Sequence, residues 1–331
     1  MNIGLSVLTN IGIRLMVKKI NKNNKYMKIL VIYNPQAGAG RAKKLFPEVK
    51  KYCEEVGLDA DFECTQHPGH AVELAKQTNL LGYDAIVASG GDGTLYEVIN
   101  GYYLNSGKLK PPLGLIPNGT GNAFMKELNL TKNDWRKAID IIKKNQIKML
   151  DVARYQADGQ QRYFMNILGT GFVSKVAEAS IPMKWMGNAA YTVATLIKLI
   201  TLKSQTVDLV IDDELQQRQA VFVEVANSRY TGTTFLIAPK AKLDDGKLDV
   251  ILLNKISRFR LLTLFNSIYD GSHISFPEVE YIQVKKIAIR EATPGKLIPD
   301  GEVLGQTPVS IECLHKDLAF IWPNDVSSSS S

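Results

Sequence analysis

Three glycine-rich loops constrain this chain most, because each directly follows a short apolar run that is typical of a buried strand. They are "NPQAGAGRA" at 34–42, "SGGDGT" at 89–94 and "PNGTGN" at 117–122. In an open parallel sheet, loops of this kind lie at the carboxyl ends of the strands, where the backbone can approach a ligand closely. The three loops therefore predict one shared edge that binds an anion, and a phosphate chain is the natural ligand.

From Met27 onward, strand and helix patterns alternate, which is typical of a parallel sheet covered by helices on both faces. A first helix carries Leu45, Val49, Tyr52 and Val56 at helical spacing, and Pro47 leaves its start uncertain. We expect the other elements of this half to be strands at 28–33, 59–65, 84–91 and 112–119 and helices at 70–77, 95–104, 122–128 and 133–144.

After about residue 150 the pattern changes to closely spaced strands, which predicts a second, mostly antiparallel domain. We expect strands at 149–156, 161–168, 206–213, 220–228, 247–254 and 279–291, with helical insertions at 188–202 and 258–271. No linker-like composition precedes the last segment, 309–323, so it is free to pack against either domain.

The chain has 331 residues, 45% of them hydrophobic and 22% charged, which is enough for about two domains. We expect an α/β domain at 27–150 and a mostly antiparallel domain at 151–323. Before them lies a basic, apolar leader at 1–26, either an interfacial helix or an extension upstream of a start at Met27. A disordered serine tail follows at 324–331.

The leader supplies five of the seven excess positive charges, so the body is nearly balanced. A balanced body argues against a nucleic-acid footprint, which needs a basic stripe on the folded domain. Cys53, Cys64 and Cys313 show no zinc or redox spacing, and a reducing cytoplasm fits them best.

The loops match neither common phosphate-binding pattern. No lysine follows the glycines as a Walker loop requires, and "GAGRAK" lacks the third glycine of a dinucleotide fingerprint. Asp92 lies between glycines, and a carboxylate beside phosphates needs a divalent cation between them, so magnesium is implied. The alternative is that Asp92 caps the following helix. Glu97, one turn on, is either part of this site or a surface residue.

Two acidic turns occur in the second half. "KAKLDDGKLDV" at 240–250 places Asp244, Asp245 and Asp249 around a glycine, which fits a hairpin or a hard-cation site equally well. "LIPDGEVLGQTP" at 297–308 places Asp300 and Glu302 on either side of a glycine, and by itself it indicates a hairpin turn.

Taken together, these motifs resemble the diacylglycerol kinase catalytic superfamily, which includes bacterial lipid kinases and the sphingosine and ceramide kinases. The resemblance covers Met27 to about Pro323. It rests on segments in family order, "YNPQAGAGRA", "ECTQHPGHA", "SGGDGTLYEVING", "IPNGTGNAF", "NSRYTGTTFLIAPKAKLDDGKLDV" and "PDGE".

The resemblance implies an NAD-kinase-like α/β nucleotide domain, an antiparallel β-sandwich domain, and ATP-dependent phosphorylation of a lipid hydroxyl in the cleft between them. It assigns Glu302 and Asp300 as the catalytic acids, with somewhat more weight on Glu302. Magnesium would be held by Asp92, and a structural magnesium by Asp245 with the carbonyls of Lys242 and Lys247. The residues expected to hold ATP are Asn34, Pro35, Gly38, Thr65, Gly90, Gly91, Asp92, Gly93, Thr94, Glu97, Gly119, Thr120 and Asn122.

Three departures from the family pattern bear on the substrate. Tyr96 stands where relatives usually have asparagine, Ala123 replaces an aspartate, and Val173 replaces an acid found in many relatives. The identity of the lipid is therefore open. Met183 and Trp185, with Met186 beside them, are either a membrane contact or ordinary helix packing.

We expect a lipid kinase in the cytoplasm, peripheral at the inner face of the membrane. Its expected partners are a lipid substrate and no nucleic acid, and a homodimer is compatible with the sequence. One alternative is a kinase of soluble NAD, whose fold and "GGDGT" loop are related. Another is a regulator that binds nucleotide or lipid without turnover. The joint presence of Asp92, Asp300 and Glu302 favours an enzyme.

Overall fold

The computed structural model describes residues 26–324 except 108, 181–193, 195, 196, 199–202, 212, 233 and 234. The leader at 1–25 and the tail at 325–331 lie outside the described residues. So do most of the helix expected at 188–202 and the membrane contact expected at Met183, Trp185 and Met186.

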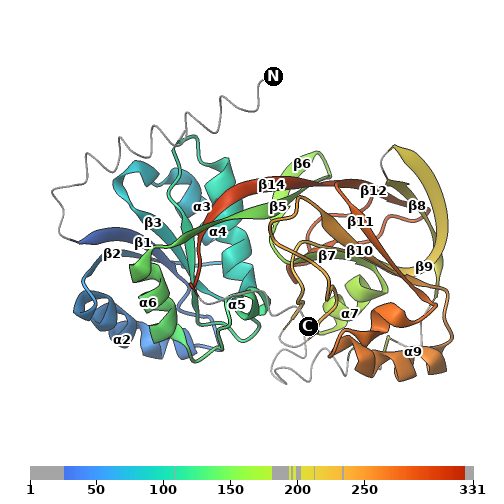
Figure 1. Cartoon of the computed structure of the whole chain (residues 1–331), viewed down its shortest axis with the longest axis horizontal. Coiled ribbons are helices and arrows are strands. Elements are labelled where there is room, and N and C mark those ends of the chain that lie inside the picture. The colour runs from blue at the N-terminus through green and yellow to red at the C-terminus, as the bar shows by residue number, and fades with distance from the viewer. Residues whose placement is uncertain are drawn as a thin grey trace.

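The N-terminal half is a parallel sheet in the order β4-β3-β1-β2. Helices α2 and α6 pack against each other, as do α3 and α4, and the two pairs cover the sheet (Figure 1). The expected alternation is confirmed. The elements are β1 Met27–Tyr33, α2 Arg41–Glu55, β2 Leu58–Cys64, α3 His70–Gln77, η2 Leu80–Gly82, β3 Ala85–Gly90, α4 Asp92–Leu104, β4 Leu113–Pro117, α5 Ala123–Glu127 and α6 Trp135–Lys144.

The C-terminal half is built from antiparallel ladders, with the order β11-β10-β9-β8-β12-β14 along its main path. Strand β7 pairs with β9 and with the short β13, and β5 pairs with β14 and β6. The elements are β5 Ile147–Ala157, β6 Gln160–Phe164, β7 Ile167–Gly171, α7 Phe172–Ser180, β8 Gln205–Ile211, β9 Glu214–Ala226, β10 Leu248–Asn254, α9 Arg258–Phe265, η4 Asn266–Ile268, η5 Ser272–Ser275, β11 Val279–Val284, β12 Lys286–Glu291, β13 Ile298–Pro299 and β14 Val309–Ile321.

Two strands expected to be continuous are each broken in two. The run at 161–168 stops at Phe164 and resumes at Ile167, and the run at 279–291 breaks at Lys285. At Lys285 the chain changes partner: Val284 pairs with Leu248 of β10, whereas Lys286 pairs with Glu312 of β14. The prediction of single strands was wrong because an apolar pattern records burial and not the partner strand.

The last segment joins both halves. Strand β14 pairs with β12 at one end, along its length with β5, and with β4 at Phe320, which lies opposite Leu113 (Figure 1). The domain boundary expected at 150/151 falls inside β5. Strands β5 and β14 therefore contribute side chains to both of the main hydrophobic clusters.

No helix within the described ranges is long and apolar enough to span a bilayer.

Candidate active site

The second and third glycine loops pack directly against each other. The backbone N–H groups of Asn118 and Gly119 both donate to the carbonyl of Gly90 at 3.0 Å. A β-carbon at Gly119 would lie 2.4 Å from Gly91 Cα. Real β-carbons do not come that close, so this contact between the loops requires glycine.

The first loop joins the other two. Asn34 Nδ2 donates to Thr94 Oγ1 at 3.0 Å, and Asn34 Oδ1 accepts from the Gln36 N–H. Gly38 has φ of +63°, and a β-carbon there would lie 2.6 Å from the carbonyl oxygen of Asn118. The expected convergence of the three loops at one sheet edge is present.

The remaining expected nucleotide residues lie around this cluster. The carbonyl of Pro35 accepts from the Lys43 N–H in the first turn of α2. Thr65 follows β2, and its N–H donates to the Tyr33 carbonyl at 2.8 Å. Thr120 is exposed at the tip of the third loop, whereas Asn122 is buried.

Asp92 begins α4, but its carboxylate reaches the start of α5. Its oxygens accept from the N–H groups of Ala123 at 2.8 Å and Phe124 at 3.3 Å. Asp92 was expected, as an alternative, to cap the helix that follows it, α4. Its carboxylate instead accepts from N–H groups at the start of α5. Desolvation raises the pKa of Asp92 to about 6, against the lowering effect of these two hydrogen bonds.

Glu97 is partly buried at the N-terminus of α3. Its two oxygens accept from the N–H groups of Gly69 at 2.8 Å and Ala71 at 3.2 Å. Burial raises its pKa despite these bonds. A carboxylate here satisfies N–H groups that an isolated helix leaves open, so Glu97 links α4 to α3, beside the loop that carries Thr65.

Asp300 and Glu302 come from the C-terminal half, on the turn after β13. The buried Asp300, at φ of +47°, accepts from the N–H groups of Met165 at 3.0 Å, Asn166 at 2.9 Å and Ile167 at 3.1 Å. These donors lie where the chain breaks between β6 and β7. Burial is the main cause that raises the pKa of Asp300 to about 7, and the charge of Asp92 adds to it.

Glu302 is exposed and faces the second glycine loop. A β-carbon at Gly93 would lie 2.5 Å from Glu302 Oε1. Acids from both halves of the chain therefore meet at the edge where the glycine loops converge. Among the described residues, Asp92, Asp300 and Glu302 form no ion pair with a lysine or arginine.

The acids of this site offer oxygens of the kind that a divalent cation binds. Carboxylate and amide oxygens are the ligands that Mg²⁺ prefers, and the oxygens of Asp92 and Asp300 are not neutralised by a described base. The buried Oδ1 of Asn122 has no hydrogen-bond partner and lies 2.7 Å from the position of a Gly119 β-carbon. An unpaired acceptor of this kind is unusual in a protein interior.

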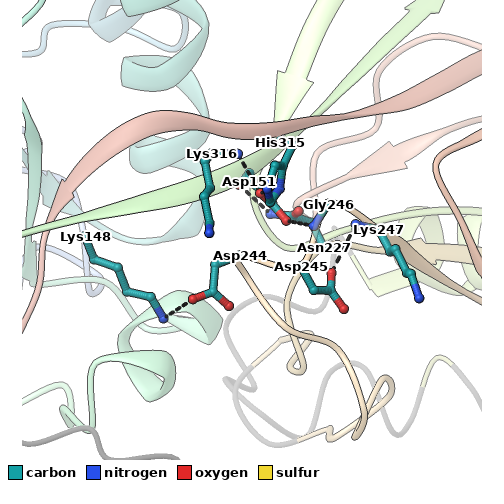
Figure 2. A network of polar contacts seen from close by, with 9 residues as sticks. All are labelled: Lys148, Asp151, Asn227, Asp244, Asp245, Gly246, Lys247, His315 and Lys316. Carbon is teal, nitrogen blue, oxygen red and sulfur yellow. Dashed lines mark hydrogen bonds and ion pairs between the residues drawn. The ribbon is translucent and has the colours of Figure 1, made fainter. Parts of the chain in front are cut away.

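The turn at 240–250 is organised by a residue that the sequence did not single out. Buried Asp151 accepts from the N–H groups of Gly246 and Lys316, both at 2.6 Å, and contacts His315 Nδ1 at 2.9 Å (Figure 2). Asp245 Oδ1 accepts from the Lys247 N–H at 3.0 Å. The preceding strand, β9, ends at Ala226 and pairs antiparallel with β10, so the turn lies in a long connection between these strands and not in a tight hairpin.

The other members of this turn are more exposed. Lys242 and Lys247 have exposed side chains, and Asp244 pairs with Lys148 at 3.1 Å (Figure 2). The expected magnesium contact of Asp245 with two backbone carbonyls stays a prediction.

The structure also shows positioning residues that the sequence analysis did not single out, in or near motifs that it did recognise. Asn118 Nδ2 donates to Ser89 Oγ at 2.8 Å, which ties β3 to the third loop. Glu127 on α5 pairs with Arg229 at 2.9 Å and also accepts from its N–H. Asn118 and Arg229 lie in quoted segments, but the partner of each is far away in sequence.

Tyr96, the departure from the family pattern, joins the two halves. Its hydroxyl lies 2.8 Å from the hydroxyl of Tyr155, and its ring belongs to the hydrophobic cluster of the C-terminal half. Desolvation raises its pKa far above the usual value. The residue is thus a buried contact between α4 and β5.

Comparison with known proteins agrees with this architecture. Residues 28–155 match the model of the diacylglycerol kinase catalytic domain. Residues 166–322 match the model of the YegS C-terminal NAD kinase beta sandwich-like domain.

Individual relatives match along nearly their whole length. A diacylglycerol kinase of Staphylococcus saprophyticus is 30% identical over 298 residues, which cover 89% of this chain and 95% of the relative. The corresponding enzyme of Bacillus subtilis is 29% identical, with 89% and 96% covered. A crystal structure of a diacylglycerol kinase from Bacillus anthracis superposes with a TM-score of 0.68 at 25% identity, covering 91% of this chain and 99% of that one. On this likeness in sequence, in both halves and in fold, the chain belongs to the diacylglycerol kinase family.

Proposed function

We propose that the protein is an ATP-dependent lipid kinase, which transfers the γ-phosphoryl group of ATP to a hydroxyl of a lipid such as diacylglycerol. One observation carries the proposal: Glu302, from the C-terminal half, lies against Gly93 of the second glycine loop, and Asp300 on the same turn is near enough for the charge of Asp92 to raise its pKa. A nucleotide at the loops and an acceptor held by the other half would meet there. The names of the relatives support the lipid class of acceptor.

In this proposal the glycine loops bind the phosphates of ATP. Because the loops pack closely through their backbones, their N–H groups and the N-termini of the helices that follow can face an anion. Asn34, Thr65 and Thr120 would contact the rest of the nucleotide at the rim. Phosphoryl transfer depends mainly on positioning and on neutralising charge, so no covalent intermediate is needed.

Glu302 is the better of the two acids for proton transfer. Its exposed carboxylate has no described partner and faces Gly93, so Oε1 can take the proton as the lipid oxygen bonds to the γ-phosphorus and ADP leaves. Asp300 already accepts three backbone hydrogen bonds, which suits a residue that fixes the turn and adds negative charge.

Magnesium would be held by Asp92, with Asp300 and Asn122 near it. When bound, it neutralises the phosphate charge that these acids would otherwise repel. A second, structural magnesium would bind Asp245 with the carbonyls of Lys242 and Lys247. The acceptor would come from a membrane surface, which is consistent with a peripheral protein on the cytoplasmic side.

A lipid panel tests this function. Purified protein is given labelled ATP and magnesium with diacylglycerol, sphingosine, ceramide or phosphatidylglycerol, and with soluble NAD in a separate reaction. We expect label in one lipid and none in NAD. Label in NAD alone, or in no acceptor while ATP still binds, would contradict the proposal.

The Glu302→Gln variant tests the role of the acid. Loss of the proton acceptor should lower kcat by about 10²–10⁴-fold. Because the side chain is exposed, nucleotide affinity and thermal stability should stay at wild-type values. The control is Glu280→Gln, which makes the same substitution on β11, where Glu280 pairs with Arg218 of β9. Unchanged turnover in Glu302→Gln would remove this residue from the mechanism.

A further inference from the structure

Helix α9 exposes large apolar side chains to solvent although its other face is well anchored. Phe259 is 79% exposed and Leu262 is 43% exposed. Positions three apart lie on the same side of a helix, so the two side chains form one apolar surface. Contiguous exposed apolar surface, unlike a single exposed side chain, often marks a site that binds a partner or a membrane.

The exposure does not come from a frayed helix. Leu261 and Leu264 are buried in a cluster with Phe172 and Val176 of α7. Ser257 caps the helix by accepting from the Arg260 N–H at 3.2 Å. The opposite face thus holds α9 on the C-terminal half beside α7 (Figure 1), and the helix presents Phe259 and Leu262 in a fixed orientation.

The charged residues on α9 and just before it are all basic, and the first acid beyond the helix is Asp270. Lys255 and Arg258 are both exposed, and neither forms an ion pair within the described part of the chain. Arg260, on the side of the helix, pairs with Glu278 at 2.8 Å and lies over Phe276. Between Lys255 and Tyr269 the sequence contains no acid. Tyr269 is 45% exposed just beyond the helix.

An apolar surface with cations at its edge complements an anionic bilayer. The rings and leucine side chain can enter the boundary of the acyl chains while lysine and arginine remain at the headgroups. Each cation near an anionic surface adds to the attraction. The helix belongs to the same half as the turn that carries Asp300: its buried face packs on α7, α7 follows β7, and β7 pairs with β13, which leads into that turn.

We propose that the outer face of α9, formed by Lys255, Arg258, Phe259 and Leu262, docks the protein on an anionic lipid bilayer. The inference rests on the proposed function in one respect, since a lipid acceptor is the reason for docking. Vesicle binding itself requires no turnover, so the surface can be tested independently of the reaction.

The test is sedimentation of the full chain with vesicles of phosphatidylcholine containing phosphatidylglycerol. We expect the Phe259→Ser/Leu262→Ser variant to lose about tenfold or more in vesicle affinity. Arg258→Glu should lose about fivefold, with the loss suppressed by high salt. The control is Leu215→Ser, which removes an apolar side chain that is 67% exposed on β9 and should bind as wild type does.

The outcomes separate this surface from the proposed function. Activity on a short-chain lipid dispersed as monomers should survive the double substitution, whereas activity on vesicle-embedded lipid should fall. If the wild type binds no vesicles, or if the double variant binds as well as the wild type, the surface is not the docking face. A dimer that dissociates in the double variant would identify a second copy as the occupant instead. Lost binding in the variant, with no lipid phosphorylated by the wild type, would contradict only the proposed function.

Discussion

Glu224 is a carboxylate that the fold buries without a compensating charge. It lies on β9 opposite Gly169 of β7 and Ile251 of β10, and its Oε2 has no hydrogen-bond partner. Val223 and Val225 belong to the central cluster of this half, so Glu224 points to the other face of the sheet. Desolvation alone raises its pKa from 4.5 to about 7.

This residue should give stability a marked pH dependence. The pKa of Glu224 is higher in the folded than in the unfolded protein, so folding favours the protonated carboxyl. The contribution of this protonated group to the free energy of unfolding is fully present below about pH 4.5 and is lost as pH rises through about 7. We expect wild type to lose on the order of 3 kcal/mol relative to Glu224→Gln across this window. Urea unfolding of both proteins at several pH values measures the difference, and a pH-independent difference would contradict the assignment.

At the scale of elements, the glycine loops and the helices that follow them act as one unit. Asp92 connects α4 to α5, Glu97 connects α4 to α3, and Gly119 brings the third loop against the second. A change in any one loop should therefore be felt by the other two.

Gly119→Ala tests this unit. Its β-carbon must displace the backbone at Gly91, so we expect a loss of about 1–3 kcal/mol in stability, as for overpacked sites. Nucleotide affinity, measured by calorimetry, should fall at the same time. Gly82→Ala is the control, because a β-carbon there meets nothing within 4 Å. If both variants bind nucleotide equally well, the loops are more independent than their contacts indicate.

At the scale of the whole molecule, β5 and β14 pass through both halves and share one antiparallel ladder. The ladder shifts register between Leu314 and Leu318, where Lys316 has φ of +50°. Asp151 binds the backbone of this irregular stretch and of the turn at Gly246 (Figure 2). It thus stabilises the part of the strands that connects the halves.

Asp151→Asn should therefore destabilise the entire protein. The amide keeps one acceptor oxygen but places an NH₂ group among backbone donors, which should cost about 2–3 kcal/mol. Unfolding should remain a single transition, shifted to lower temperature in calorimetry. Asp244→Asn, which loses only the partly exposed pair with Lys148, should change stability by about 1 kcal/mol or less. Separate transitions for the two halves would show that the shared strands do not couple them.

Much of this architecture could be predicted from local patterns. The helix expected at 70–77 is α3 with the same bounds, and the run at 28–33 lies within β1. Apolar periodicity is a local property, so it identifies a strand or helix wherever burial is continuous. The positions of the glycine loops after β1, β3 and β4 followed from the same alternation.

Other features depended on contacts between distant residues. The acids of the turn at 300–302 would by themselves indicate only a hairpin, and the family resemblance alone singled them out. The partners of Asp92 are 31 and 32 residues away, and those of Asp300 are 133 to 135 residues away. Glu127 and Arg229 are 102 residues apart, and Asp151 and Lys316 are 165 residues apart.

The parallel first half, the antiparallel second half and the residue types at the site could be predicted without a structure, because they depend on local periodicity and on recognisable motifs. Which strand each segment joins, and where β6 and β7 separate, became known only from the folded chain. The folded chain also shows that Tyr96 packs between the halves and that carboxylates from both halves meet. Burial, hydrogen-bond partners and pKa depend on residues that only the folded chain brings together.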